Sequence, residues 1–289
     1  MTTRIDAHCH LWRLERGDYG WLGGEGLEAL RRDFEPHDLA AVHSPAGIRR
    51  AVVVQAAPTV AETQFLLDLA ETAPAVAGVV GWVDLASPDA AETLDEIASP
   101  HLLGVRPMLQ DLAEDDWIVT APTAAAIAAL RAASLRFDAL VMPRHLRHLV
   151  RFVEAHPDLP VIVDHAAKPA LGAPADDPRH AAWREGMAAL GRTGAYVKIS
   201  GLFTEMRPDQ RATPAAAAAT LRPLVDDLLE WFGSDRIAWG SDWPVLTLAD
   251  EMSAWDETTA LLLAELSAEA RTAILGGNAA TFYGLEDAR

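Results

Sequence analysis

Short apolar runs recur along the chain, and each is followed by a stretch with helical periodicity. Runs such as 51–54 and 160–163 have no polar residue to alternate with the apolar ones. This pattern is typical of strands buried on both faces of a parallel sheet. Strands are predicted at 4–12, 51–55, 79–85, 103–109, 137–141, 160–165, 196–200 and 237–244.

The segments between these runs predict helices. Thr59 and Glu62 have the spacing of a capping box, in which each residue satisfies a backbone N–H of the other. Helices are predicted near 36–40, 59–69, 88–98, 123–133, 143–156, 181–190, 221–231, 252–266 and 268–275.

Regular alternation of strand and helix predicts a parallel sheet, and eight such units in 289 residues fit a closed (β/α)8 barrel, or TIM barrel. No linker rich in Ser, Gly or Pro divides the chain, so we expect one α/β domain over residues 1–289. The alternative is an open, doubly wound sheet, which ordinarily carries a Gly-rich phosphate loop after its first strand. His8-Cys9-His10 occupies that place here.

The first predicted strand carries the clearest candidate chemistry. Side chains alternate between the two faces of a strand, so Asp6, His8 and His10 are expected to share one face. Ile5, Ala7, Cys9 and Leu11 fall on the other face. Two imidazoles on one face form half of a metal or proton-transfer site. The Gly- and Trp-rich segment 13–36 that follows is long for a loop, and we expect it to form a wall or lid over the strand's end.

Charge and cysteine content narrow the classes of partner. The formal net charge of −18 disfavours nucleic acid and anionic membranes, although a local Arg/Lys cluster can still hold a small anion. Cys9 is the one cysteine, which excludes an intramolecular disulfide and favours a reducing compartment. No signal-peptide pattern and no apolar run near the ~20 residues of a membrane span are present. We expect a soluble, cytoplasmic protein, and a homo-oligomer stays open.

Polar residues collect at the carboxyl ends of the predicted strands. In a (β/α)8 barrel these ends form the face that carries the reacting groups. Buried polar side chains there are unfavourable unless they are paired, so one shared cavity is the economical interpretation. The residues are His8, His10, Gln55, Trp82, Asp84, Arg106, His165, Lys168, Lys198, Ser200 and Asp242.

These stretches resemble the amidohydrolase superfamily, in its branch of sugar-lactone hydrolases similar to L-fuconolactonase. The resemblance covers nearly the whole chain, in order. It is carried by Asp6-Ala7-His8-Cys9-His10-Leu11-Trp12, Val54-Gln55-Ala56-Ala57-Pro58, Gly81-Trp82-Val83-Asp84-Leu85, Gly104-Val105-Arg106-Pro107-Met108-Leu109-Gln110-Asp111, Asp164-His165-Ala166-Ala167-Lys168-Pro169, Lys198-Ile199-Ser200-Gly201-Leu202, Gly240-Ser241-Asp242-Trp243-Pro244 and Gly277-Asn278-Ala279-Ala280-Thr281-Phe282-Tyr283.

The resemblance implies that His8, His10, His165 and Asp242 form the core of the site, as candidate metal ligands. Binuclear members of the superfamily use a lysine or glutamate on strand four and a histidine on strand five. Arg106 occupies strand four here, and 137–141 contains no histidine. We therefore expect one divalent ion, Zn2+ being the best match to imidazole and carboxylate ligands, while a metal-free site stays open.

The expected reaction is the opening of a sugar-acid lactone, an aldonolactone, by water. Asp242 and His165 are the candidate catalytic residues, with Asp242 taking the proton of the water and returning it to the leaving oxygen. Substrate contacts are expected from Arg106, Gln55, Trp82, Asp84, Lys168 and Lys198. Lys168 can instead border a helix start, Lys198 can extend past the core, and the role of His145 stays open.

Two other functions are considered. A decarboxylase on the same scaffold is the main alternative, although decarboxylases of this superfamily usually keep the strand-five histidine that is absent here. A sugar-binding barrel without catalysis is the other, and the complete set of three histidines and one aspartate argues against it.

Overall fold

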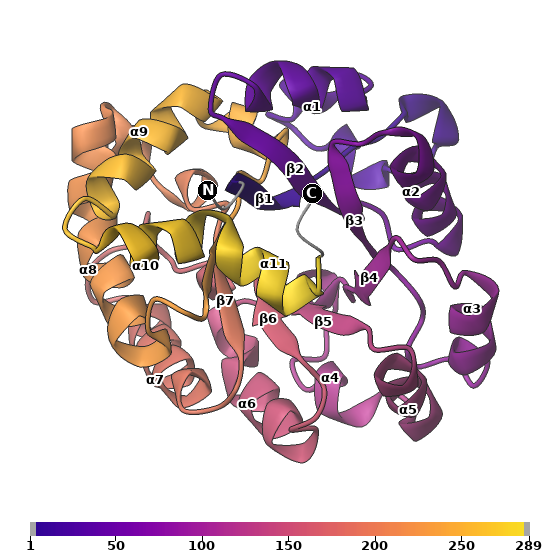
Figure 1. Ribbon diagram of the computed structural model, residues 1–289. Helices are drawn as coiled ribbons and strands as arrows, with labels where there is room; N and C mark the ends of the chain where they lie inside the picture. Colours follow the sequence, from indigo (N-terminus) through magenta and orange to yellow (C-terminus); the bar gives the residue numbers. More distant parts are fainter. Residues whose placement is uncertain (1–3, 286–289) are drawn as a thin grey trace.

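Eight parallel strands form a barrel in the computed structural model, which describes residues 4–285. They pair in chain order from β1 to β8 (Figure 1). The ring closes where His10 N–H donates to Trp243 O at 2.7 Å and Asp242 N–H donates to His8 O at 2.8 Å. The strands are β1 (Arg4–Cys9), β2 (Ile48–Val54), β3 (Val76–Gly81), β4 (Leu102–Val105), β5 (Arg136–Ala139), β6 (Val161–Val163), β7 (Tyr196–Ile199) and β8 (Ile237–Trp239). The (β/α)8 prediction is confirmed.

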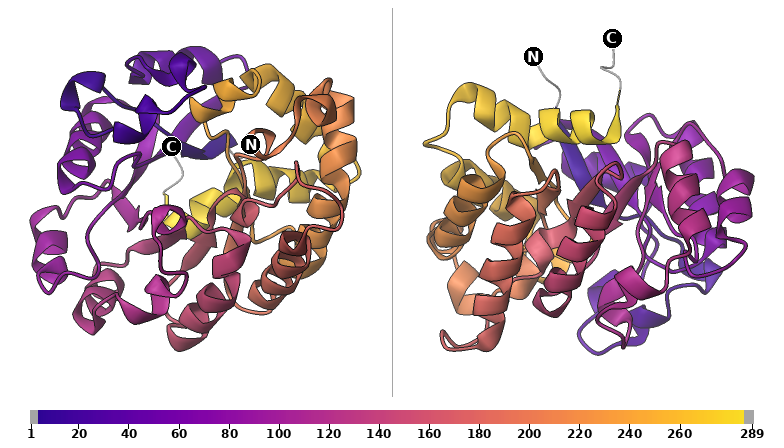
Figure 2. Two further views of the ribbon diagram at one scale, coloured as in Figure 1. Left: turned by 180° about the vertical axis from the view of Figure 1, so that it is seen from behind. Right: turned by 90° about the horizontal axis from the view of Figure 1, so that it is seen from below.

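Helices surround the barrel and also cross one of its mouths (Figure 2). Thr59, Thr123 and Thr213 each accept a backbone N–H at the start of the following helix, so local capping sets where these helices begin. The helices are α1 (Pro36–His43), α2 (Val60–Thr72), α3 (Ala90–Glu96), α4 (Trp117–Thr120), α5 (Ala124–Ala132), α6 (Leu146–Ala155), α7 (Pro178–Gly191), α8 (Pro214–Phe232), α9 (Met252–Leu262), α10 (Ala268–Thr272) and α11 (Asn278–Tyr283). Within residues 4–285, no helix is long and apolar enough to cross a bilayer.

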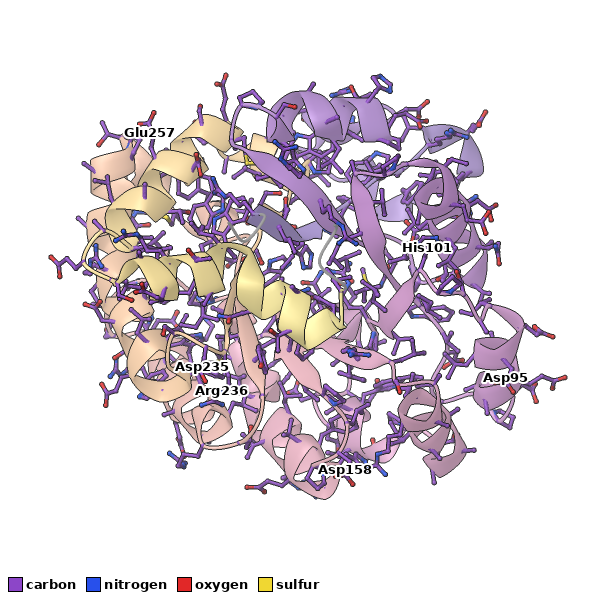
Figure 3. All side chains as sticks on the ribbon, viewed as in Figure 1. Asp95, His101, Asp158, Asp235, Arg236 and Glu257 are labelled. Atoms are coloured by element: carbon purple, nitrogen blue, oxygen red, sulfur yellow. The ribbon has the colours of Figure 1, made fainter. Side chains whose placement is uncertain are left out.

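The outer surface carries the excess negative charge of the chain. Asp95, Asp158 and Glu257 are exposed and project outward from the ring of helices (Figure 3). One part of the barrel interior is apolar, with residues such as Val52, Val80 and Ile162 packed together from several strands. The protein therefore separates its surface charge from the ionisable groups buried inside.

Helix α11 covers the mouth of the barrel at which β1 begins (Figures 1 and 2). Ala279, Phe282 and Tyr283 pack against Ile5 and Ala7 of β1. The Tyr283 hydroxyl donates to Asp138 Oδ2 at 2.6 Å inside the barrel. The last helix thus joins the apolar interior to a buried polar network.

Strand β1 departs from the predicted alternation. Asp6 pairs with Ala51 and Cys9 with Val53, so three steps along β1 match two along β2. This irregularity is a β-bulge. It turns both Ala7 and His8 inward, and the predicted shared face of Asp6 with His8 and His10 is wrong.

Asp6 faces the outside of the barrel, where it joins three elements. Its carboxylate lies 2.9 Å from His43 Nε2 of α1 and accepts the N–H of Ser241 after β8 at 2.9 Å. It also accepts the N–H of His8 at 3.0 Å. Asp6 therefore supports the histidine strand from behind instead of facing its pocket.

The contact between α11 and the interior predicts a stability effect. In Tyr283→Phe the buried Asp138 carboxylate loses one donor, so the free energy of unfolding should fall by about 1–3 kcal/mol. Tyr196→Phe is the matched control, because Tyr196 packs on the same apolar cluster and its hydroxyl has no hydrogen bond among residues 4–285. Equal midpoints of chemical denaturation for the two variants would contradict this role of the Tyr283 hydroxyl.

Candidate active site

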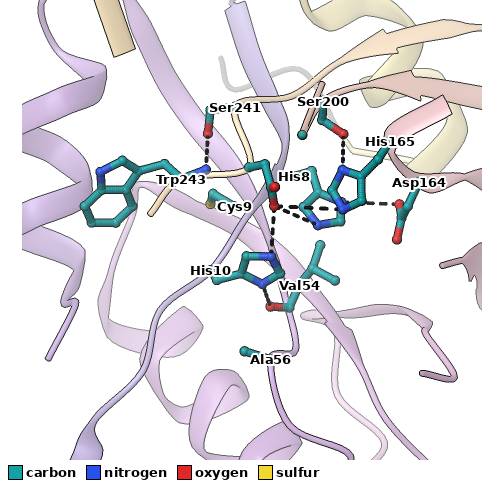
Figure 4. Close-up of polar contacts among 12 residues, drawn as sticks. His8, Cys9, His10, Val54, Ala56, Asp164, His165, Ser200, Ser241 and Trp243 are labelled. Atoms are coloured by element: carbon teal, nitrogen blue, oxygen red, sulfur yellow. Dashed lines mark hydrogen bonds and ion pairs between the residues drawn. The ribbon is translucent and has the colours of Figure 1, made fainter. Parts of the chain in front are cut away.

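The side chains of His8, His10, His165 and Asp242 meet at the carboxyl ends of β1, β6 and β8. Asp242 Oδ1 lies 3.3 Å from His10 Nε2, 3.7 Å from His8 Nε2 and 3.9 Å from His165 Nε2 (Figure 4). All four residues are buried. The structure thus brings together the full set of metal ligands expected from the sequence.

The donor geometry fits a divalent metal ion. A Zn2+ ion with ligand distances of about 2.0–2.1 Å places neighbouring ligand atoms roughly 3.0–3.4 Å apart, and the 3.3 Å between Asp242 Oδ1 and His10 Nε2 lies in this range. Ligand atoms of His8, His10 and Asp242 all lie within 4.8 Å of one another, and His165 is outside this group although its Nε2 lies 3.9 Å from Asp242 Oδ1. His10 Nδ1 lies 2.7 Å from Val54 O and His165 Nδ1 lies 2.9 Å from Ser200 Oγ, so their Nε2 atoms are left for a metal.

His8 has two competing partners on its far side. Its Nδ1 lies 3.2 Å from Asp164 Oδ1 and 3.2 Å from Lys198 Nζ. Because an ammonium group only donates, a neutral His8 accepts from Lys198 when its proton is on Nε2. Donation from Nδ1 to Asp164 leaves Nε2 free for a metal ion. Binding of a metal therefore requires the tautomer that Asp164 stabilises.

A buried ionic network lies behind His8. Lys198 Nζ lies 2.5 Å from Asp138 Oδ2 and 2.9 Å from Asp164 Oδ1, and all three side chains are inaccessible to solvent. Burial alone would lower the pKa of Lys198, but the two carboxylates raise it. Burial raises the pKa of Asp138 to about 6, although Lys198 opposes the shift. Lys198, predicted as a substrate contact, does not line the pocket and is paired with the two aspartates instead.

The backbone around His165 has an unusual conformation. His165, Ala166, Ala167 and Lys168 all have positive φ, between 47° and 61°, which makes one left-handed turn. Such a conformation is unfavourable by roughly 1–2 kcal/mol per non-glycine residue, so it persists only where packing enforces it. Trp183 Nε1–H donates to Ala166 O at 2.7 Å and holds the turn. The turn brings both His165 and Lys168 to the lining of the pocket.

Gly201 permits the close approach of two ligands. A Cβ atom at this position would lie 2.5 Å from His165 Nδ1 and 2.9 Å from Asp242 Oδ2, and the φ angle is +61°. Only glycine fits both the conformation and the space. Three residues of the motif Lys198-Ile199-Ser200-Gly201 thus serve the site: Lys198 is a buried cation, Ser200 is the partner of His165, and Gly201 leaves space for the two ligands.

Three of the four candidate ligands, His10, His165 and Asp242, line a pocket of about 230 Å3, and His8 is fully buried beside them. Arg106 and Lys168, predicted as substrate contacts, are on its wall, together with Trp21 from the segment 13–36. Six further residues line this pocket, none of which was predicted as a site residue: Ala56, Met108, Gln110, Asp111, Leu140 and Val245. Gln110 and Asp111 directly follow the predicted fourth strand. Their polar side chains at the start of the loop are the signal that could have identified them.

Three other predicted substrate contacts lie elsewhere. Gln55 is fully buried and its side chain donates to Arg106 O at 2.8 Å, while the Arg106 guanidinium donates to Gln55 O. Gln55 therefore positions Arg106 and does not line the pocket. Trp82 and Asp84 line a neighbouring cavity, because the chain turns outward after β3 ends at Gly81.

Glu62 is a further residue that supports the pocket. Thr59 Oγ1 accepts the Glu62 N–H at 3.1 Å, which is the first half of the predicted capping box. The Glu62 carboxylate instead accepts the N–H groups of Ala56, at 3.0 Å, and Ala57, at 2.7 Å. Since Ala56 O accepts the indole N–H of Trp21 at 2.9 Å, Glu62 indirectly holds the Trp21 wall.

The comparisons with known proteins agree with this architecture. The amidohydrolase family model matches residues 5–285, and the chain belongs to this family. It is 42% identical to the L-fucono-1,5-lactonase of Burkholderia ambifaria, over 99% of this chain and 97% of that protein. The L-fucono-1,5-lactonase of Burkholderia multivorans is 36% identical, over 98% and 97% of the two chains. The predicted superfamily is confirmed.

Solved structures show the same barrel. A crystal structure of an amidohydrolase from Burkholderia multivorans with bound Zn superposes with a TM-score of 0.88 at 35% identity, covering 98% of this chain and 99% of that chain. A second crystal form with bound HEPES gives a TM-score of 0.90 at 36% identity, with the same coverage. A homologue that binds zinc, together with the histidine and aspartate cluster, supports a divalent metal site here.

Gly201 generates a prediction about metal binding. In Gly201→Ala the new methyl group displaces His165 and Asp242, so Zn2+ affinity measured by calorimetry should fall by about 10- to 100-fold. Gly233→Ala is the control, because Gly233 has a similar φ of +67° and its added Cβ would meet the flexible Asp235 side chain. Equal Zn2+ affinities in the two variants would contradict the displacement of His165 and Asp242 by the added methyl group.

Glu62 generates a prediction about pH. Burial raises the pKa of Glu62 from 4.5 to about 7 in the folded protein, despite its backbone donors. Between these two values the folded state binds more protons than the unfolded state. The free energy of unfolding should therefore fall as the pH rises from 4.5 to about 7, by up to about 3 kcal/mol.

The variant Glu62→Gln removes this titration, and Glu71→Gln on the exposed face of the same helix does not. Thermal unfolding of both variants and of the wild type across this pH range measures the difference. A wild-type slope that persists in Glu62→Gln would assign the titration to another group.

Proposed function

We propose that this amidohydrolase opens the ring of a sugar-acid lactone, an aldonolactone of the L-fucono-1,5-lactone type, by adding water to the ester carbonyl. The observation that carries the proposal is the meeting of three imidazoles and one carboxylate beside a 230 Å3 pocket that also contains Arg106 and Lys168. Two relatives that are L-fucono-1,5-lactonases at 42% and 36% identity support the same substrate class.

The metal ion is proposed to be Zn2+, held by His8, His10, His165 and Asp242. Imidazole and carboxylate are ligands that zinc accepts, and the related amidohydrolase from Burkholderia multivorans has been crystallised with zinc. When bound, such an ion supplies Lewis acidity, which polarises a carbonyl and lowers the pKa of water to ~7.

Asp242 is proposed as the proton carrier of the reaction. Burial would raise its pKa, but His165, His10 and His8 hold the pKa well below the ordinary value, so the carboxylate is ionised at neutral pH. It can take one proton from the attacking water while the oxygen of that water bonds to the carbonyl carbon. When the ring C–O bond breaks, the same proton passes to the ring oxygen, which leaves as a hydroxyl group. Lactone and water together give a single product, the hydroxy acid.

Arg106 is proposed to act on the oxygen atoms of the substrate, and His165 is proposed to donate to them only in a site without a metal ion. Burial lowers the pKa of His165 to about 4, so its ring is neutral at neutral pH and its position is fixed by Ser200. Arg106 is held by the backbone of Gln55 and lies 3.6 Å from Asp164 Oδ2. A fixed guanidinium presents paired donors to vicinal hydroxyls or to the carboxylate of the product. Lys168 adds a second cation to the same wall.

The decarboxylase alternative has less support. β5 ends at Ala139, and the pocket residue that follows it is Leu140. His145 is buried outside the pocket lining, and its Nδ1 accepts the N–H of Met142 at 3.0 Å. Decarboxylases among the structural neighbours are 14–16% identical, which shows a shared fold alone.

A cytoplasmic location and a small-molecule partner are proposed from the cysteine content and net charge of the chain. The single cysteine, Cys9, is buried and unpaired, which suits a reducing cytoplasm. The net charge of −18 argues against nucleic acid and anionic membranes as partners, and leaves a small sugar lactone as the expected one. A role in sugar-acid breakdown follows from that substrate class.

Removal of the proposed proton carrier should abolish turnover. In Asp242→Asn the amide cannot take a proton, so kcat on an aldonolactone panel should fall by about 10²- to 10⁴-fold. Asp226→Asn, at an exposed position on α8, is the control. Zinc content measured on the same samples separates loss of the metal from loss of the base. A kcat within tenfold of the wild-type value in a zinc-loaded Asp242→Asn sample would refute the assignment.

A further inference from the structure

A second cavity, of about 520 Å3, adjoins the catalytic pocket. The two cavities share Trp21, Met108 and Asp111 as lining residues, so these side chains form the boundary between them. None of the four candidate metal ligands lines the second cavity. Its volume is about twice that of the catalytic pocket, yet the proposed reaction assigns it no role.

The lining combines two kinds of side chain. Trp21, Trp82 and Trp117 provide indole rings from the segment 13–36, the loop after β3 and helix α4. Asp18, Asp84 and Asp111 provide carboxylates. Indole faces pack against the C–H faces of a sugar ring, and carboxylates accept hydrogen bonds from its hydroxyls.

Several of these groups have unused hydrogen-bonding capacity. Asp84 accepts one bond, from Ala86 N–H at 3.0 Å, through Oδ1. Among residues 4–285, the carboxylate of Asp111 and the indole N–H groups of Trp82 and Trp117 have no hydrogen-bond partner, and all three side chains are at least partly exposed. The described residues that line the cavity include no Lys or Arg. The cavity therefore suits an uncharged, hydroxylated ring better than an anion.

Size gives an independent argument. Small-molecule sites commonly measure about 300–1,000 Å3, and the catalytic pocket at 230 Å3 lies below that range. Joined across Trp21 and Met108, the two cavities fall within it. A substrate with one ring fits the first cavity, and a substrate with two rings would use both.

We propose that the cavity lined by Trp21, Trp82 and Trp117 is a second sugar subsite. The enzyme then accepts lactones of disaccharide aldonic acids, in which the lactone ring lies beside His10, His165 and Asp242 and the glycosidic sugar packs against the tryptophans. This inference rests on the proposed lactonase function, and it adds the substrate class for which the second cavity is built.

The test compares glucono-1,5-lactone with maltobiono-1,5-lactone and lactobiono-1,5-lactone. In the wild type, kcat/KM should be higher for at least one disaccharide lactone than for glucono-1,5-lactone. In Trp117→Ala that advantage should shrink by about two- to tenfold, while kcat/KM on glucono-1,5-lactone stays unchanged, because Trp117 lines only the second cavity. Trp117→Phe should keep most of the advantage. Trp231→Ala, a half-buried tryptophan of α8, is the control and should keep all of it.

Two results would overturn the subsite. One is a wild-type enzyme that prefers the monosaccharide lactone to both disaccharide lactones. The other is an equal loss on all three lactones in Trp117→Ala, which would make Trp117 a support of the catalytic pocket. In either case, opening of glucono-1,5-lactone by the wild type would leave the lactonase function standing.

Calorimetry with sodium maltobionate and sodium gluconate decides the subsite independently of turnover. The disaccharide acid should bind more tightly to the wild type, with a smaller difference in Trp117→Ala. If none of these lactones is opened, the binding difference alone supports or overturns the subsite, and turnover of L-fucono-1,5-lactone decides the proposed function separately.

Discussion

The structure depends on the neutralisation of charge inside the barrel. His8, Asp138, Asp164 and Lys198 are fully buried, and an unpaired charge at any of these positions would be strongly unfavourable. Lys198 lies between the two aspartates, and Asp164 in turn lies beside His8. The polar interior is therefore one connected unit, and the orientation of the histidine strand cannot be separated from the state of the lysine behind it. Asp6 supports the same strand from the outside.

Much of the architecture was predictable because its signals are local. Short apolar runs identified the strands after the first, and the first strand was identified from its alternating residues. The polar residues at the strand ends included all four groups that meet at the candidate metal centre. These signals depend only on composition and period. The long aromatic segment after the first strand was predicted to form a wall or lid, and Trp21 of this segment lines the pocket.

The failures came from features that tertiary packing decides. The bulge in β1 reverses the face of Asp6, and nothing in residues 4–12 indicates it. The left-handed turn at 165–168 contains no glycine, the usual sign of positive φ. Lys198 and Gln55 occupy strand ends, as predicted, but partners from other strands keep them away from the pocket. Position along a strand could be predicted, whereas the direction of a side chain depended on distant residues.

The packing of α11 has a consequence for biosynthesis. Tyr283 is close to the last described residue, and its hydroxyl reaches Asp138 in the barrel interior. A chain still emerging from the ribosome lacks this helix, so one mouth of the barrel stays open to water until α11 has been synthesised. Maturation of the barrel interior is then coupled to the synthesis of α11, long after β1 to β8 have formed.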